Sequence, residues 1–264
     1  MIQNYLIVNI AQSWGITFLM VNLFFLFYLY SKKISVIDLF WGPLHFLQLF
    51  FCFYFGLNRS SIALSLYLGL VFVWSLRLTI YLYVRSIGAP DDPRYLKLAK
   101  NWKGNLALNV LLRIFYIQFI ISLITSSTLI LTITSRTEIS FGWVNIFGFV
   151  LSIFGLMYES LADFQLYRFK KNKVNKGKVM NFGLWKFSRH PNYFGEILFW
   201  WGIWISSYET NYWGFGIISP LTITYLLTRF SGVPMLEERY KNNPEYLAYI
   251  RKTNTLIPGR KVDE

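Results

Sequence analysis

The sequence is short of charge and of cysteine, and both shortages narrow the class of protein. Only 15% of its 264 residues are charged, whereas a soluble domain carries about 25%. The single cysteine, Cys52, excludes a disulfide within the chain. The first lysine is Lys32, so the N-terminus lacks the basic region of a signal peptide. We therefore expect no signal peptide.

Several motifs of soluble enzymes are absent as well. No Gly-x-Gly-x-x-Gly follows a strand, there is no Walker sequence, and no Cys or His residues have the spacing of metal ligands. A bound nucleotide would therefore lie between helices and not on a Rossmann sheet. The net charge of +13 would suggest nucleic acid in a soluble protein. We predict no nucleic-acid partner, because membrane orientation explains the charge pattern better.

Apolar residues dominate what is present. They make up 55% of the chain and recur in runs of about 20 residues from end to end. We predict an all-α, polytopic membrane protein that forms a single domain over residues 1–264. A cytoplasmic amphipathic segment over 228–264 follows the last span, and the last two spans are short enough to form a hairpin that does not fully cross. The seven predicted spans are 14–30, 34–55, 62–84, 106–133, 143–167, 193–207 and 213–227.

The basic residues predict the orientation. Of the 26 Lys and Arg residues, 22 fall on one side of the predicted spans, and only Arg59 and Arg136 fall on the other. The positive-inside rule then places the N-terminus outside and the C-terminus in the cytoplasm. The short loops favour a bacterial inner membrane, with the endoplasmic reticulum as the alternative.

The second predicted span carries one narrow polar stripe. Asp38, Trp41, His45 and Gln48 fall at i, i+3, i+7 and i+10, so they share one face of a helix. Polar groups in hydrocarbon are costly and require partners or a function. The stripe either joins two helices by hydrogen bonds or lines a cavity and supplies a proton donor.

The third predicted span contains Arg77, with Tyr81 one turn later. A buried Arg needs a carboxylate partner, and Asp38 is the natural candidate. Asp38, His45, Arg77 and Tyr81 are our candidate catalytic residues.

A second concentration of polar residues follows Phe182. Arg189, His190, Asn192, Tyr193 and Glu196 occur within eight residues, together with Pro191 and Gly195. Proline suits the first turn of a helix, and glycine permits close approach of another backbone or a ligand. On such a helix Asn192 and Glu196 share a face, and an anion beside Arg189 would meet unpaired backbone N–H groups. This pattern predicts a site for a phosphate-bearing, hydrogen-bonding ligand at the membrane edge.

The fifth predicted span ends with two carboxylates, Glu159 and Asp163, four residues apart and followed by Arg168. They either belong to an ion-pair cluster at the cytoplasmic rim or accept hydrogen bonds from ribose hydroxyls or an adenine amino group. The lysine-rich loop 170–178 indicates orientation and contact with lipid headgroups.

The string Arg-His-Pro-Asn-Tyr-Phe-Gly-Glu over 189–196 resembles the motif of the steroid 5α-reductase superfamily, in particular its DUF1295 branch. The resemblance extends over 38–258 and is strongest over 158–201. It implies an NADPH-dependent oxidoreductase that acts on a lipophilic substrate, such as a sterol-like enone or another unsaturated lipid. Hydride would pass to a carbon–carbon double bond conjugated to a carbonyl group.

The resemblance also implies roles for single residues. Asn192, Tyr193 and Glu196 match the motif, Glu159 and Asp163 fall where the family contacts the nucleotide, and Glu237 resembles the family's late glutamate. By the same resemblance, phosphates would be faced by Arg168, Arg189 and His190. Two positions depart from the steroid reductases: Trp74 stands where they have an acidic tyrosine, and Val233 where they have an arginine. We therefore prefer Asp38 as the acid, followed by His45 and Tyr81.

Two other functions fit the same residues. An S-adenosylmethionine-dependent methyltransferase of the isoprenylcysteine type shares Arg-His-Pro-x-Tyr and the late glutamate. A non-enzymatic lipid-binding membrane protein would explain the helices and the charge asymmetry, but not the concentration of polar residues over 189–196.

Overall fold

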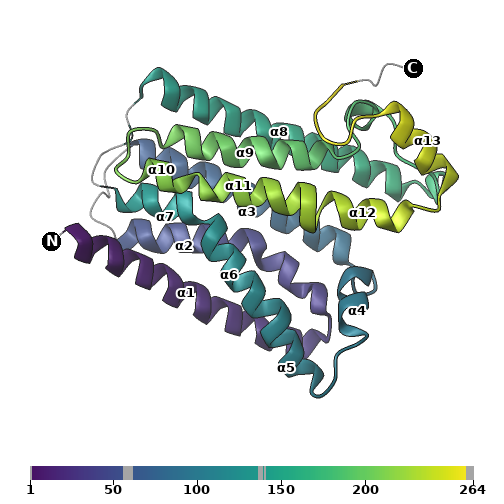
Figure 1. Ribbon diagram of the computed structural model, residues 1–264, viewed down its shortest axis with the longest axis horizontal. Coiled ribbons are helices and arrows are strands. Elements are labelled where there is room, and N and C mark those ends of the chain that lie inside the picture. Colours follow the sequence, from purple (N-terminus) through teal and green to yellow (C-terminus); the bar gives the residue numbers. More distant parts are fainter. Residues whose placement is uncertain (1, 56–61, 136–138, 140, 260–264) are drawn as a thin grey trace. The chain divides into compact units, whose positions relative to one another are not determined.

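The computed structural model describes residues 2–55, 62–135, 139 and 141–259. Arg59 and Arg136, which the orientation argument used, lie outside these residues, as do the last five residues of the predicted segment 228–264. The described residues form helices and no strand. The chain is therefore an all-α, multi-pass membrane protein, as predicted (Figure 1). The α-helices are α1 (Ile2–Ser31), α2 (Trp41–Phe55), α3 (Ile62–Ser86), α4 (Pro93–Ala99), α5 (Leu106–Val110), α6 (Tyr116–Thr125), α7 (Ser127–Thr134), α8 (Trp143–Lys171), α9 (Pro191–Ser206), α10 (Trp213–Gly216), α11 (Ile218–Tyr225), α12 (Val233–Tyr240) and α13 (Pro244–Lys252).

Five stretches among the described residues are long and apolar enough to cross a membrane. They cover residues 6–31, 34–55, 62–86, 106–125 and 143–171, and they correspond to the first five predicted spans. Helix α9 has 16 residues and is therefore about 24 Å long, less than the hydrocarbon core of about 30 Å. Full crossing by the last two predicted spans stays a prediction.

The fourth predicted span is a helical path with two interruptions. A π-helical turn, Leu111–Phe115, separates α5 from α6, and Ser126 separates α6 from α7. The chain divides into two compact units, residues 1–145 with 207–219 and residues 146–206 with 220–264. The predicted single domain stays a prediction.

In the first unit, α2 packs closely on α3. A side chain at Gly42 would lie 2.6 Å from the Ser75 carbonyl oxygen, so glycine is required for this approach. A buried apolar cluster joins α1, α2 and the helical path after Asn105, and its fully buried members include Val21, Leu44 and Phe115. The core of this unit is thus made by the same apolar runs that predict its spans.

The loop before α4 docks on the start of the second span. The Asp91 carboxylate accepts hydrogen bonds from the backbone N–H groups of Ile34 at 2.7 Å and Ser35 at 2.9 Å. These N–H groups belong to the first turn of a 3₁₀ helix, Ile34–Phe40, which runs directly into α2. Helix starts leave such donors without partners. Asp91 therefore caps this span from a distant part of the sequence.

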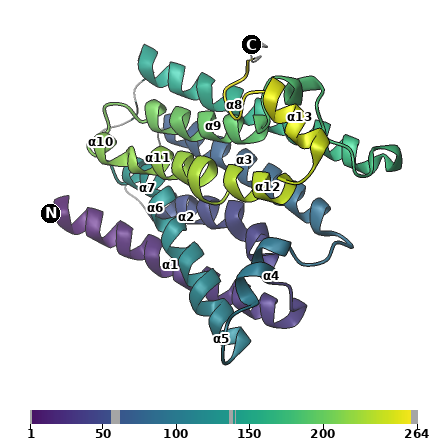
Figure 2. The ribbon, with the colours of Figure 1, turned by 45° about the vertical axis from the view of Figure 1, so that its right-hand side comes forward.

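In the second unit, α8 and α9 run antiparallel with their backbones in contact, and they lie side by side in both views (Figure 1, Figure 2). A side chain at Gly155 would lie 2.5 Å from Phe199 N, and one at Gly195 would lie 2.6 Å from Glu159 N. Small residues permit this kind of close helix packing in membranes. The prediction that Pro191 begins a helix and that Gly195 permits a close backbone approach is confirmed.

Candidate functional site

The contact between α8 and α9 brings together the acidic residues that the sequence singled out. Glu159 and Asp163 on α8 and Glu196 on α9 are buried, with 5%, 4% and 9% of their surfaces exposed. Asn192 Nδ2 donates to Asp163 Oδ1 at 3.2 Å, which links the two helices. Glu196 Oε1 accepts from Trp200 Nε1 at 2.8 Å, one turn further along α9. We call these four residues, Glu159, Asp163, Asn192 and Glu196, the seam site.

The orientation of the Asn192 amide follows from its partner. A carboxylate offers only acceptors, so Asn192 must turn its NH₂ group toward Asp163. Its carbonyl oxygen, Oδ1, is then buried and has no hydrogen-bond partner in the part of the chain that the structure describes. The seam site is therefore rich in hydrogen-bond acceptors, which suits a ligand that carries donors.

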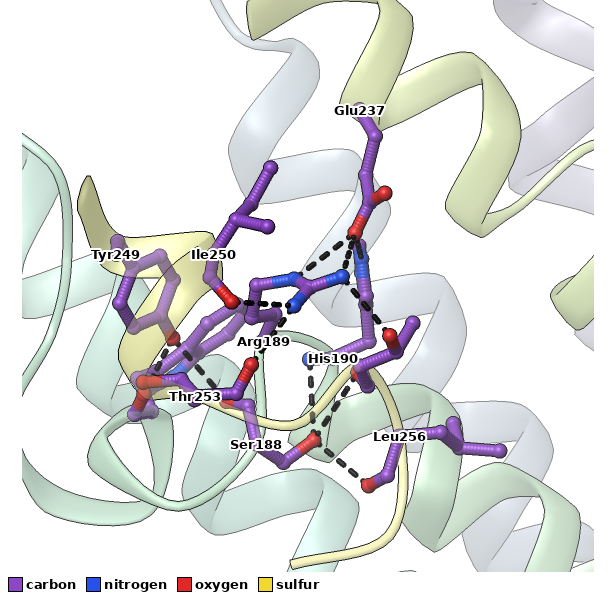
Figure 3. Close-up of polar contacts among 10 residues, drawn as sticks. Ser188, Arg189, His190, Glu237, Tyr249, Ile250, Thr253 and Leu256 are labelled. Carbon is purple, nitrogen blue, oxygen red and sulfur yellow. Dashed lines mark hydrogen bonds and ion pairs between the residues drawn. The ribbon is translucent and has the colours of Figure 1, made fainter. Parts of the chain in front are cut away.

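Arg189, directly before α9, forms a second cluster with residues from the C-terminal part of the chain (Figure 3). Its side chain is 5% exposed and donates from every nitrogen. Nε and Nη2 donate to Glu237 Oε1 at 2.9 and 2.7 Å, and Nη2 also donates to Thr255 Oγ1 at 2.8 Å. Nη1 donates to the carbonyl oxygens of Thr253 at 2.7 Å and Ile250 at 3.3 Å.

These contacts account for all five N–H groups of a guanidinium. Arg189 thus joins α12, α13 and the residues after α13 to the start of α9. Phosphate binding by Arg189 stays a prediction, and it would require the loss of one of these bonds.

Glu237 holds His190 as well as Arg189. Its Oε1 atom lies 3.4 Å from His190 Nε2, so one oxygen takes all three contacts (Figure 3). The hydrogen bond from His190, aided by the charge of Arg189, holds the pKa of Glu237 below its ordinary value. Burial lowers the pKa of His190, against the opposing effect of Glu237. His190 is fully buried and its ring stacks on Tyr193, with the ring centres 5.2 Å apart.

The last described residues fold back on the segment before α9. Ser188 Oγ donates to the Leu256 carbonyl at 2.7 Å, and Arg189 N donates to the Asn254 carbonyl at 2.9 Å. The buried Tyr249 donates to the carbonyls of Trp185 and Ser188. We call residues 244–259 the C-terminal strap. In the structure the strap packs on residues 185–190.

Two predicted contributors lie apart from both clusters. Arg168 is exposed, and its guanidinium lies over the ring of Phe164, 5.7 Å from the ring centre. The lysines of the loop 170–178 are exposed too, as contact with headgroups requires. The structure thus brings Asn192 to Asp163, and Arg189 and His190 to Glu237, but it leaves Arg168 at the surface.

The polar stripe of the second span serves helix packing in the first unit. His45 is fully buried, with Nδ1 2.9 Å from the Trp41 carbonyl and Nε2 2.8 Å from Thr125 Oγ1 on α6. Gln48 Nε2 donates to Ser122 Oγ on α6 at 2.9 Å. Of the two interpretations left open for this stripe, these bonds favour the one in which it joins helices.

Asp38 has partners that the sequence did not reveal. It accepts hydrogen bonds from Tyr95 through Oδ1, at 2.5 Å, and from Arg94 through Oδ2, at 3.2 Å. The expected pairing of Asp38 with Arg77 is therefore wrong, and the Arg77 guanidinium lies 5.8 Å from the ring centre of Tyr81. The only signal for the true pairing was a charged residue and a tyrosine in the loop after the third span, 56 and 57 residues away.

The candidate catalytic residues Asp38, His45, Arg77 and Tyr81 belong to the first unit, and the candidate cofactor residues all belong to the second. Their roles stay predictions, since geometry alone does not reveal a ligand.

Comparison with known proteins gives the family. The chain is 28% identical over 280 residues to an uncharacterized protein of Schizosaccharomyces pombe, a match that covers 92% of this chain and 78% of that protein. No solved structure matches it. The family described as "Protein of unknown function (DUF1295)" matches residues 24–253. The chain therefore belongs to the DUF1295 family, a steroid 5α-reductase-like branch of membrane proteins.

Proposed function

We propose that this protein is a membrane-embedded reductase that uses NADPH to saturate a lipophilic substrate. The observation that carries the proposal is the seam site, in which buried acceptors from α8 and α9 meet at the motif that resembles reductases. Ribose hydroxyls, a carboxamide and an adenine amino group are donors that such acceptors bind. Membership of the DUF1295 family, a branch similar to steroid reductases, supports the same reading.

NADPH, when bound, supplies a hydride to the substrate. The seam site would hold and orient the cofactor through Asp163, Asn192 and Glu196. Tyr193 would contribute contact area beside His190, on which its ring stacks. Burial of these groups excludes water and strengthens each hydrogen bond.

Reduction of a double bond conjugated to a carbonyl also needs a proton. We keep Asp38 as the first candidate for its supply, because Tyr95 gives this carboxylate a proton-bearing neighbour. His45 ranks lower, since both of its ring nitrogens already have partners within the helix bundle. Arg77 and Tyr81 would orient or polarise the carbonyl group of the substrate. The protein would work with its C-terminus in the cytoplasm, where NADPH is available, most simply in a bacterial inner membrane.

S-adenosylmethionine remains the alternative cofactor, because its ammonium group is also a donor that carboxylates bind. The two cofactors transfer different atoms to the product. A reductase adds one hydride from NADPH and one proton from water, whereas a methyltransferase adds a methyl group.

The test is an isotope-transfer assay on purified protein reconstituted with a total lipid extract. One sample receives NADPH deuterated at the transferable position of the nicotinamide ring, and a parallel sample receives S-adenosylmethionine with a deuterated methyl group. Mass spectrometry should find a lipid that gains one deuterium from NADPH and one hydrogen from water. Asn192→Ala should abolish the transfer, whereas Lys241→Gln, at an exposed ion pair with Glu238, should not. Methyl transfer without reduction would contradict the proposal.

A further inference from the structure

Arg189 and His190 both contact one carboxylate oxygen, Oε1 of Glu237. This arrangement determines which ring nitrogen of His190 carries the proton. Glu237 is bound to Arg189 by two hydrogen bonds of 2.7 and 2.9 Å. The charge of the guanidinium favours an ionised carboxylate, which can only accept hydrogen bonds. His190 Nε2 faces the same oxygen at 3.4 Å. A hydrogen bond across this distance requires that Nε2 carry the proton.

The protonation of the other ring nitrogen, Nδ1, then follows. Burial disfavours the charged imidazolium, and a neutral imidazole has a single N–H group. With the proton on Nε2, Nδ1 is a bare acceptor. This atom is buried, on a side chain that is fully buried, and it has no hydrogen-bond partner among residues 2–55, 62–135, 139 and 141–259. An orphaned buried acceptor costs about 1–3 kcal/mol if nothing satisfies it.

A second acceptor of the same kind lies two residues away. Asn192 Oδ1 is buried and has no partner within the described chain, because the amide NH₂ is turned to Asp163. Both acceptors belong to residues at the start of α9. A phosphate group offers only acceptors when it is fully ionised, so it does not match either atom. A hydroxyl, an amide N–H or an amino group does.

We propose that Glu237 fixes His190 in its Nε2–H form, so that Nδ1 and Asn192 Oδ1 together accept hydrogen bonds from donor groups of the ligand. Glu237 is thus a positioning residue and not a direct cofactor ligand. His190 accepts a hydrogen bond from a donor group of the cofactor and does not bind its phosphates. This differs from the role that the resemblance implied for it. The identity of the ligand as NADPH rests on the proposed function, but the tautomer of His190 does not.

The tautomer can be measured directly, because the chain has only two histidines. The protein is labelled with ¹⁵N-histidine and reconstituted in nanodiscs, and the signals that disappear in His190→Phe belong to His190. We expect its Nε2 to carry the proton and its Nδ1 to be bare. Glu237→Ala should abolish this preference and leave the signals of His45 unchanged. A proton on Nδ1 in the wild-type protein would overturn the proposal, and this wild-type result stands even if Glu237→Ala does not fold.

Ligand binding tests the second part of the proposal, that Nδ1 of His190 accepts a hydrogen bond from a donor group of the ligand. NADPH should shift the Nδ1 signal of His190, and inorganic phosphate should not. His190→Phe keeps a ring to stack on Tyr193 but loses the acceptor, so it should weaken NADPH binding about tenfold, the effect of one hydrogen bond near the upper end of its range. Lys241→Gln should bind as the wild type does.

Analogues identify which donor is recognised. One carries an acetyl group in place of the carboxamide, a second carries hypoxanthine in place of adenine, and a third lacks a ribose hydroxyl. The analogue that lacks the recognised donor should bind equally to the wild type and to His190→Phe. Equal tenfold losses for all three would overturn the assignment of a specific donor to His190.

The outcomes separate this proposal from the proposed function. If NADPH binds without changing Nδ1, or if phosphate alone changes it, the donor-binding role is wrong and the reductase proposal stands. If His190 has a bare Nδ1 but the protein does not bind NADPH, the reductase proposal fails and the tautomer assignment stands.

Discussion

Replacement of Gly195 by alanine should push α8 and α9 apart and so disturb the seam site. A Cβ atom at this position would lie 2.6 Å from Glu159 N and 2.7 Å from the Gly155 carbonyl oxygen. These are backbone atoms, which cannot rotate away. An ordinary contact begins at 3.4 Å, so the two helices would have to separate by 0.8 Å, the difference between 3.4 and 2.6 Å.

The magnitude follows from two opposing effects. Overpacking of this kind costs about 1–3 kcal/mol, and the higher helix propensity of alanine returns up to about 1 kcal/mol. A net loss of about 1–2 kcal/mol should lower Tm by about 2–8 °C in a chain of this size. The same separation would stretch the bond between Asn192 and Asp163 from 3.2 Å to about 4.0 Å, beyond hydrogen-bond range.

The assay is thermal unfolding in detergent, followed by tryptophan fluorescence, with and without NADPH. The matched control is Gly69→Ala on α3, where an added side chain meets no atom within 4 Å; it should be neutral or slightly stabilising. If Gly195→Ala were as stable as the wild type and bound NADPH equally well, the close contact between α8 and α9 and its role in the seam site would both be refuted.

Three further predictions concern the segments around the two clusters. Arg189→Ala should destabilise the protein by about 3 kcal/mol, because it leaves Glu237 without its cation, and limited proteolysis should then cut the C-terminal strap; an uncut strap would contradict its anchoring role. The pKa of Glu237 is lowered in the folded state, so its contribution to stability is complete above the ordinary glutamate pKa of about 4.3 and is lost as the pH falls below it. Unfolding measured from pH 7 down to about pH 3, below the ordinary glutamate pKa, should show this loss in the wild type and less of it in Glu237→Gln. Asp91→Ala should cost about 1 kcal/mol and speed hydrogen exchange at Ile34 and Ser35, whereas unchanged exchange would show that Asp91 does not cap the span.

The helices could be predicted from the sequence because a bilayer imposes length and hydropathy on each span. Pro191 and Gly195 added local detail, since each has a backbone property that fits few positions. The shortness of α9 was visible in the same way. The interruptions of the fourth span were not, because the turn over 111–115 contains no proline or glycine that would signal it.

The site was predictable where its members are close in the sequence or share a helix face. Asn192 and Asp163 were both candidates because each stands in a polar group at the end of an apolar run. The partners of Asp38 and Arg189 were harder to predict, since they lie about 50 to 65 residues away along the chain. Arg189 in particular looks like an anion site in the sequence, and only the structure shows that its donors are used within the protein.

Equilibrium binding to the purified protein tests most directly whether the seam site binds NADPH. The wild type and Asn192→Ala are each titrated with NADPH and with S-adenosylmethionine, with thermal stabilisation as a second readout. We predict saturable binding of NADPH to the wild type, at least tenfold weaker binding to Asn192→Ala, and no saturable binding of S-adenosylmethionine to either. Binding of S-adenosylmethionine alone, or equal NADPH binding by both proteins, would contradict the account.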